Sequence, residues 1–136
     1  MQFVLHELLN AEQHYATLPA FQESVNRELV DQYLEAAADF CENELSPLNQ
    51  VGDREGCTWN DGVVTTPTGF KEAYQKYVEL GFPSLAAEEQ YGGQALPNSL
   101  GIIISEMVGT SNWAWGMYPG LSHGVVRTLE HHGSTE

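Results

Sequence analysis

The stretch from Glu28 to Leu45 constrains the fold more than any other part of the chain, because its apolar residues recur only at helical spacing. One stripe repeats at intervals of three and four residues: Val30, Leu34, Ala37, Ala38, Cys41 and Leu45. Such periodicity is typical of an amphipathic helix with one buried face. Proline disfavours the helical conformation in the residue before it, so Pro47 is predicted to end this helix.

Four further segments are predicted to be helical. Phe3 to Leu9 predicts a short helix, which must dock on other chain because short helices are marginal in water. Pro19 breaks any longer helix in the mixed stretch 14–25. A second amphipathic helix is predicted from Pro67 to Leu80, with Gly81 as its C-terminal cap.

The third helix is predicted from Asn98 or Ser99, either of which can cap it, to about Ser111. One face carries Leu100, Ile103, Ile104, Met107 and Val108. Ile102 lies on the opposite side, so this helix is expected to be central. An aromatic-rich stretch follows, and Pro119-Gly120 is predicted to interrupt the chain before a last helix that Gly133 ends. The order of segments predicts an all-α fold, a helical bundle.

The chain from Asn49 to Pro67 is predicted to be mostly loop. Asn60-Asp61-Gly62 predicts a turn that leads into a short extended piece at Val63-Val64. The acidic residues of this loop lack the spacing of an EF-hand, so an exposed turn is the favoured interpretation over a calcium site.

The chain is strongly acidic, with 19 acidic against five basic residues and a formal net charge of -14. This composition argues against binding to nucleic acid or an anionic membrane, because phosphate recognition needs clustered Lys and Arg. No apolar run reaches the roughly 18 residues of a transmembrane helix, and no signal peptide is recognisable. Two isolated cysteines, Cys41 and Cys57, favour a cytoplasmic or other reducing compartment, with Cys41 buried on its helix.

Three groups of residues merit consideration as functional sites. Glu106 is a carboxylate on an apolar helix: a structural hydrogen bond is the favoured interpretation, a pocket-lining role is the alternative, and catalysis is least favoured. His123, His131 and His132 lack the spacing of ligands on adjacent turns, which argues against a metal site. Trp113, Trp115 and Tyr118 could line a pocket, form core or contact a neighbouring domain. No residue is predicted to be catalytic.

The segment around Tyr91-Gly92-Gly93 resembles a known family. "ELGFPSLAAEEQYGGQALP", residues 79–97, is similar to the acyl-CoA dehydrogenase segment in which a helix ends in Gly and an "EEYGG" turn leads into the next helix. "PLNQVGDREG", "TPTGFKEAYQKY" and "FVLHELL" resemble the branch that includes 3-methylmercaptopropionyl-CoA dehydrogenase. "HHGSTE" at the end is similar to the start of the segment that leads into the middle β-domain. Gln90 and Ala95 depart from the commoner "PEEYGGxGL" form.

The resemblance implies the amino-terminal helical domain of an FAD-dependent enzyme that dehydrogenates acyl-CoA thioesters in fatty acid metabolism. It implies residues 1–25 as an additional helix and linker and 26–136 as the main bundle. In this family the FAD and the catalytic glutamate belong to a middle β-domain and a C-terminal helical domain, so neither is expected in this chain, which should be inactive alone. By alignment on "IISEM", one wall of the acyl pocket is expected at Ile102, Ile103, Glu106, Met107 and Thr110.

The resemblance further implies acyl-CoA as the substrate, an electron-transfer flavoprotein as the electron acceptor and a homo-oligomer. A different class of function stays open beside it. The chain could be a self-standing α-helical interaction module, because its apolar helix faces would be exposed without partner domains.

Overall fold

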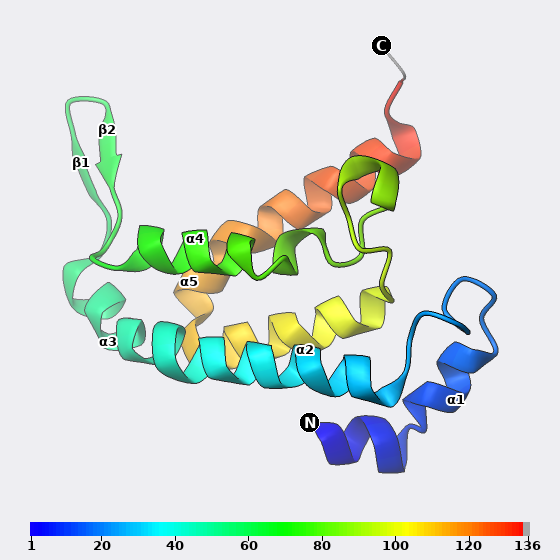
Figure 1. Ribbon diagram of the computed structural model, residues 1–136. Helices are drawn as coiled ribbons and strands as arrows, with labels where there is room; N and C mark the ends of the chain where they lie inside the picture. The colour runs from blue at the N-terminus through cyan, green and yellow to red at the C-terminus, as the bar shows by residue number, and fades with distance from the viewer. Residues whose placement is uncertain (135–136) are drawn as a thin grey trace.

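A computed structural model describes residues 1–134, which form helices and one small β-hairpin (Figure 1). The elements in chain order are η1 (Val4–Leu8), α1 (Ala11–Ala16), α2 (Arg27–Phe40), η2 (Cys41–Leu45), α3 (Ser46–Glu55), β1 (Thr58–Asn60), β2 (Val63–Thr65), α4 (Phe70–Glu79), η3 (Phe82–Ser84), η4 (Glu89–Tyr91) and α5 (Asn98–His132). The predicted all-α class is confirmed. Thr135 and Glu136, part of the segment expected to lead into a further domain, lie outside the described residues.

The prediction that Pro47 ends the second helix is wrong. Helical structure continues from α2 through η2 and α3 to Glu55, so the stretch from Asn49 to Glu55 is helix and not loop. A proline inside an α-helix removes one hydrogen bond and crowds the carbonyl four residues earlier. Here η2 is a π-turn, in which the Ser46 amide donates to the Cys41 carbonyl. The wider turn lies directly before Pro47 and accommodates it without ending the helix.

The core lies where α2 and η2 pack against the first part of α5. The predicted stripe is buried at Val30, Leu34, Ala37 and Leu45, and it faces Leu100, Ile104 and Val108. Figure 1 shows α2 and the first part of α5 running side by side in the same direction. Aromatic rings close one end of this core: the Trp115 ring centroid lies 5.8 Å from that of Phe40 and 5.4 Å from that of Tyr77.

A β-hairpin fills the region that the sequence predicted as a turn and an extended piece. β1 and β2 are antiparallel, with Trp59 opposite Val64. The turn residues Asp61 and Gly62 both have positive φ, 46° and 82°. This conformation is typical of a two-residue hairpin turn and explains the Asp-Gly pair. The prediction found β2 and its turn but not the strand that pairs with it.

The double glycine after η4 has two separate structural causes. Gly92 has φ 78° and ends η4 in the left-handed conformation, which favours glycine. Gly93 lies against the backbone of Ala87, where an added Cβ would come within 2.0 Å of the carbonyl oxygen. The turn is therefore fixed by backbone conformation at one glycine and by space at the next.

The long helix α5 bends sharply, but not where the sequence predicted. Pro119-Gly120 was expected to interrupt it, whereas the non-helical residue is Asn112, with φ −157° and ψ 87°. The Asn112 side-chain oxygen accepts a hydrogen bond from the Trp115 amide at 3.1 Å, so Asn112 caps the helix that restarts after it. Pro119 lies inside that second helix. We call residues 98–111 the first half of α5 and residues 113–132 the second half.

Candidate functional site

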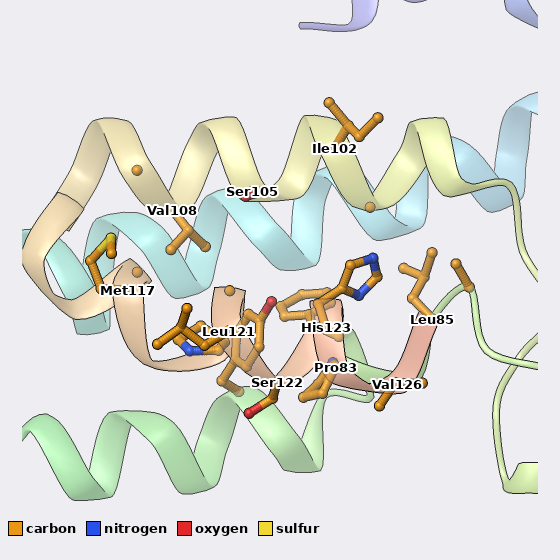
Figure 2. A pocket seen from close by; sticks show the side chains of 18 of the residues that line it. Pro83, Leu85, Ile102, Ser105, Val108, Met117, Leu121, Ser122, His123 and Val126 are labelled. Carbon is orange, nitrogen blue, oxygen red and sulfur yellow. The ribbon is translucent and has the colours of Figure 1, made fainter. Parts of the chain in front are cut away.

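A cavity of about 550 Å³ lies between the two halves of α5 and the chain around η3 (Figure 2). The first half contributes Asn98, Gly101, Ile102, Ser105, Val108 and Gly109. The second half contributes Trp113, Met117, Leu121, Ser122, His123 and Val126, together with the small residues between them. The opposite side is formed by Tyr74, Tyr77, Phe82, Pro83, Leu85 and Ala86.

The bend at Asn112 creates the cavity, because it turns the second half back along the first (Figure 1). Asn112 is buried and fixed at both ends of its amide: its nitrogen donates to the Leu45 carbonyl at 3.3 Å, and its oxygen caps the second half. Trp115 is anchored nearby, since its indole N–H donates to the Phe70 carbonyl at 3.1 Å. These three hydrogen bonds hold the second half to both η2 and α4.

The lining of the cavity is mainly apolar and contains no Asp, Glu, Lys or Arg. Its polar groups are phenol, hydroxyl, amide and imidazole, from Tyr74, Tyr77, Ser105, Ser122, Asn98 and His123. Burial raises the pKa of Tyr77 to about 12, so its phenol is neutral at physiological pH. A cavity of this kind can hold an apolar chain with a few hydrogen bonds, and it offers no cation to a phosphate group.

Figure 2 shows how the labelled side chains lie around the cavity. Val108 points from the first half toward the second, and His123 points from the second half toward the first. Ile102 contributes to the lining, but its side chain lies on the outer side of the first half. Leu85 and Val126 lie toward one end of the cavity, and Met117 lies toward the end near the bend.

The five residues expected at a pocket wall lie on two faces of the first half. Ile102, Glu106 and Thr110 are exposed on one face at four-residue intervals, and the Thr110 hydroxyl donates to the Glu106 carbonyl oxygen at 2.8 Å. Ile103 and Met107 are half-buried and pack against the core. The first half is therefore buried on one face and open on the other, unlike the central helix that its composition predicted.

Of the lining residues of the second half, the sequence indicated only Trp113 as one that could line a pocket. The apolar residues of this half were recognised as a helix, but the expected break at Pro119-Gly120 hid the return of this helix along the first half. The available signal was Asn112, a residue type that commonly begins helices, placed directly after the predicted end at Ser111.

The other candidate residues do not gather at one site, although Trp113 and His123 both line the cavity. Trp115 is core, whereas Trp113 and Tyr118 are exposed. Cys41 is buried as predicted, and Cys57 is exposed with its sulfur 3.4 Å from the Tyr118 hydroxyl.

Within residues 1–134 no three His, Cys, Asp or Glu side chains gather as metal ligands. Over the same residues, no helix is both long enough and apolar enough to cross a bilayer.

Comparison with known proteins relates most of the chain to one family. Residues 27–136 match the family described as acyl-CoA dehydrogenase, N-terminal domain. The chain is also 35% identical over 101 residues to the 3-methylmercaptopropionyl-CoA dehydrogenase of Ruegeria pomeroyi. That match covers 74% of this chain and 17% of the relative, so the chain corresponds to a small part of that protein.

Proposed function

The chain belongs to the acyl-CoA dehydrogenase family as an amino-terminal domain, and we propose that in a longer enzyme it forms one wall of the pocket for the acyl group of an acyl-CoA thioester. The observation that carries the proposal is the apolar, uncharged lining of the cavity between the two halves of α5. An acyl chain gains about 0.8 kcal/mol for each methylene that it buries, so such a lining favours it.

The exposed face at Ile102, Glu106 and Thr110 has a defined part in this proposal. These side chains are free to contact the thioester end of the substrate or the domain that closes the pocket. Ile103 and Met107 lie behind them, where they pack against the core and hold the helix in place. The wall would thus be positioned by buried residues and would contact the ligand through exposed ones.

The chemistry of dehydrogenation falls outside this chain in our proposal. The dehydrogenation would need FAD as the hydride acceptor. The cavity lining has no Lys or Arg for the pyrophosphate of FAD, so the residues present do not fit the cofactor. We propose that further domains hold the flavin and the base that removes the α-proton, and that they contact an electron-transfer flavoprotein and other subunits of a homo-oligomer.

The proposal is tested by expressing this chain together with the reading frame that follows it in its source. We expect a yellow flavoprotein that reduces an artificial acceptor when given acyl-CoA. Ile102→Trp adds an indole ring to the exposed face that we propose contacts the substrate. It should raise KM for acyl-CoA roughly tenfold or more, since a change of a single methylene in an apolar site already has effects of about this order. Flavin content should be unchanged.

The matched control is Val78→Trp, which places the same indole ring at an exposed position on α4 outside the cavity lining. It should leave KM as in the wild type. An unchanged KM in Ile102→Trp would overturn the pocket-wall role, and a downstream frame without flavin-binding domains would overturn the enzyme assignment for this protein.

A second candidate function rests on a separate observation. Leu121, Val125 and Leu129 form an exposed apolar row on the second half of α5, which favours an α-helical interaction module. Light scattering on the chain joined to its downstream frame separates the two functions when the wild type is compared with Leu129→Asp, because Leu129 belongs to the exposed row but not to the cavity lining. Loss of flavin or turnover indicates that the row packs inside the enzyme, whereas loss of a separate bound protein supports the module.

A further inference from the structure

His6 is a buried histidine whose two ring nitrogens both face carboxylates. It comes from η1 and is 4% exposed. Its Nε2 lies 2.8 Å from Asp31 Oδ1 in α2, and its Nδ1 contacts Glu12 in α1. A neutral imidazole has one N–H and can donate to only one of these carboxylates, whereas the protonated ring donates to both.

We propose that residues 1–25 form a pH-sensitive strap, in which the protonated ring of His6 clamps η1 and α1 onto α2, and loss of that proton loosens the clamp. Loosening follows because the deprotonated nitrogen then turns its lone pair toward a carboxylate oxygen. The proposal does not depend on the function proposed above.

The charged groups around His6 favour its protonated form. Glu12 faces it from α1, and Asp31 faces it from α2. Glu7 of η1 points to Arg27 instead, with 3.4 Å between Oε1 and Nη2. Arg27 also lies 4.0 Å from Asp31, and its positive charge lowers the pKa of His6. Two carboxylates thus contact the imidazole, and one more distant cation opposes them.

The direction of the pH effect follows from the two shifted groups. Burial lowers the pKa of His6, but the hydrogen bonds that the protonated ring donates to Asp31 and Glu12 outweigh this effect and leave the pKa above its usual range. The hydrogen bond to His6 lowers the pKa of Asp31. A raised histidine pKa gives stabilisation that is complete below about pH 6.5 and is lost as pH rises through the folded-state value. Because the pKa of Asp31 is lowered, the stabilisation by its carboxylate is present above about pH 4 and is lost as pH falls further. The strap is therefore tightest between these limits and loosens on the alkaline side.

The strap reaches the cavity through Tyr15. This residue is buried in α1, and its hydroxyl lies 2.8 Å from Ser99 Oγ in the first turn of α5. The neighbours of Ser99 include Asn98, Gly101 and Ile102, which line the cavity. A loosened clamp at His6 therefore weakens the contact between Tyr15 and Ser99 at the first turn of one cavity wall.

Hydrogen exchange of the chain between pH 5.5 and 9, corrected for the intrinsic pH dependence of exchange, tests the proposal. Protection of amides 5–16 should fall at least tenfold as pH rises through the His6 titration, which NMR of its ring proton measures in the same sample. His6→Gln should show low protection at every pH. The control is His14→Gln, since His14 lies exposed on α1 and should leave the wild-type curve unchanged.

Two further variants keep the test decisive if His6→Gln fails to fold. Asp31→Asn should lower the measured His6 pKa and shift the loss of protection by the same amount. Tyr15→Phe should keep the pH dependence at amides 5–9 but abolish it at amides 98–102. Wild-type protection that stays constant with pH, or a midpoint that differs from the His6 titration by more than about one pH unit, would overturn the proposal.

Discussion

The two halves of α5 have the same sequence pattern and opposite surroundings. In the first half, Leu100, Ile104 and Val108 recur every four residues and are 1%, 2% and 3% exposed. In the second half, Leu121, Val125 and Leu129 recur at the same interval and are 71%, 58% and 63% exposed. Helical periodicity therefore identifies a helix, but burial depends on whether another element covers the apolar row.

The difference has a simple structural cause. The first half packs against α2, whereas the row on the second half has no covering element among residues 1–134. Exposed apolar surfaces of this kind are typical of interaction sites and ligand grooves. The match covers 17% of the Ruegeria relative, which agrees with our proposal that this chain acts as part of a longer enzyme.

The largest expected effect is at Trp115, the fully buried residue of the second half. Trp115→Ala removes a fully buried ring and its hydrogen bond to the Phe70 carbonyl, and should lower the free energy of unfolding by about 3–5 kcal/mol. Trp113→Ala is the matched control at an exposed position and should cost less than about 0.5 kcal/mol. Urea denaturation measures both. Equal losses would contradict the burial difference.

The next effect compares matched leucines in the two halves. Leu100→Ala should lower the free energy of unfolding by about 2–5 kcal/mol, because it leaves a cavity beside α2. Leu129→Ala should change it by less than about 0.5 kcal/mol. Thermal unfolding followed by circular dichroism gives both values. A large loss at Leu129 would mean that its row is covered in solution, by a second copy or by the chain itself.

Asn112 tests the junction between the halves. Asn112→Ala removes the cap on Trp115 and leaves the Leu45 carbonyl without its buried donor, at a cost of about 1–3 kcal/mol. Asn112→Ser keeps an acceptor for the cap and should recover roughly 1 kcal/mol of that loss. Chemical denaturation at equal protein concentration separates the variants. No difference between Ala and Ser would show that the cap contributes nothing.

The smallest expected effect has the opposite sign and should be the same in both halves. An added Cβ at Gly101 or at Gly120 would meet no atom within 4 Å. Replacing a helical glycine by alanine then stabilises the helix by about 0.5–1 kcal/mol. Differential scanning calorimetry should record a higher Tm for Gly101→Ala and for Gly120→Ala. A higher Tm for Gly101→Ala but not for Gly120→Ala would indicate that the second half loses its helix before the core unfolds.

The sequence predicted the features that depend on residues close together in the chain. The stripe of α2 is buried as expected, and Gly81 follows α4 in the left-handed conformation with φ 76°. Both features follow from side-chain periodicity or from the conformational freedom of glycine, which act within a few residues.

The two prolines were misinterpreted because their effect depends on the backbone around them. Pro47 follows a π-turn that accommodates it, and Pro119 lies within a helix that starts at the cap on Asn112. The cavity could not be predicted for the same reason. Its second wall exists only because Asn112 turns the chain back, and the hydrogen bond that fixes this residue reaches Leu45, far away in the sequence.

The bend at Asn112 also allows the second half of α5 to rotate as a rigid helix about one residue. From Trp113 to His132 this half is about 30 Å long at 1.5 Å per residue, and its pivot is a single non-helical residue. A rotation of about 10° at that pivot would carry the far end roughly 5 Å while the near end hardly moves. The cavity would then widen or narrow between Leu85 and Val126 and keep its dimensions beside Val108 and Met117. A partner bound at Val125 and Leu129 would therefore act on the end of the cavity between Leu85 and Val126 more than on the end near Trp115, which is fixed in the core.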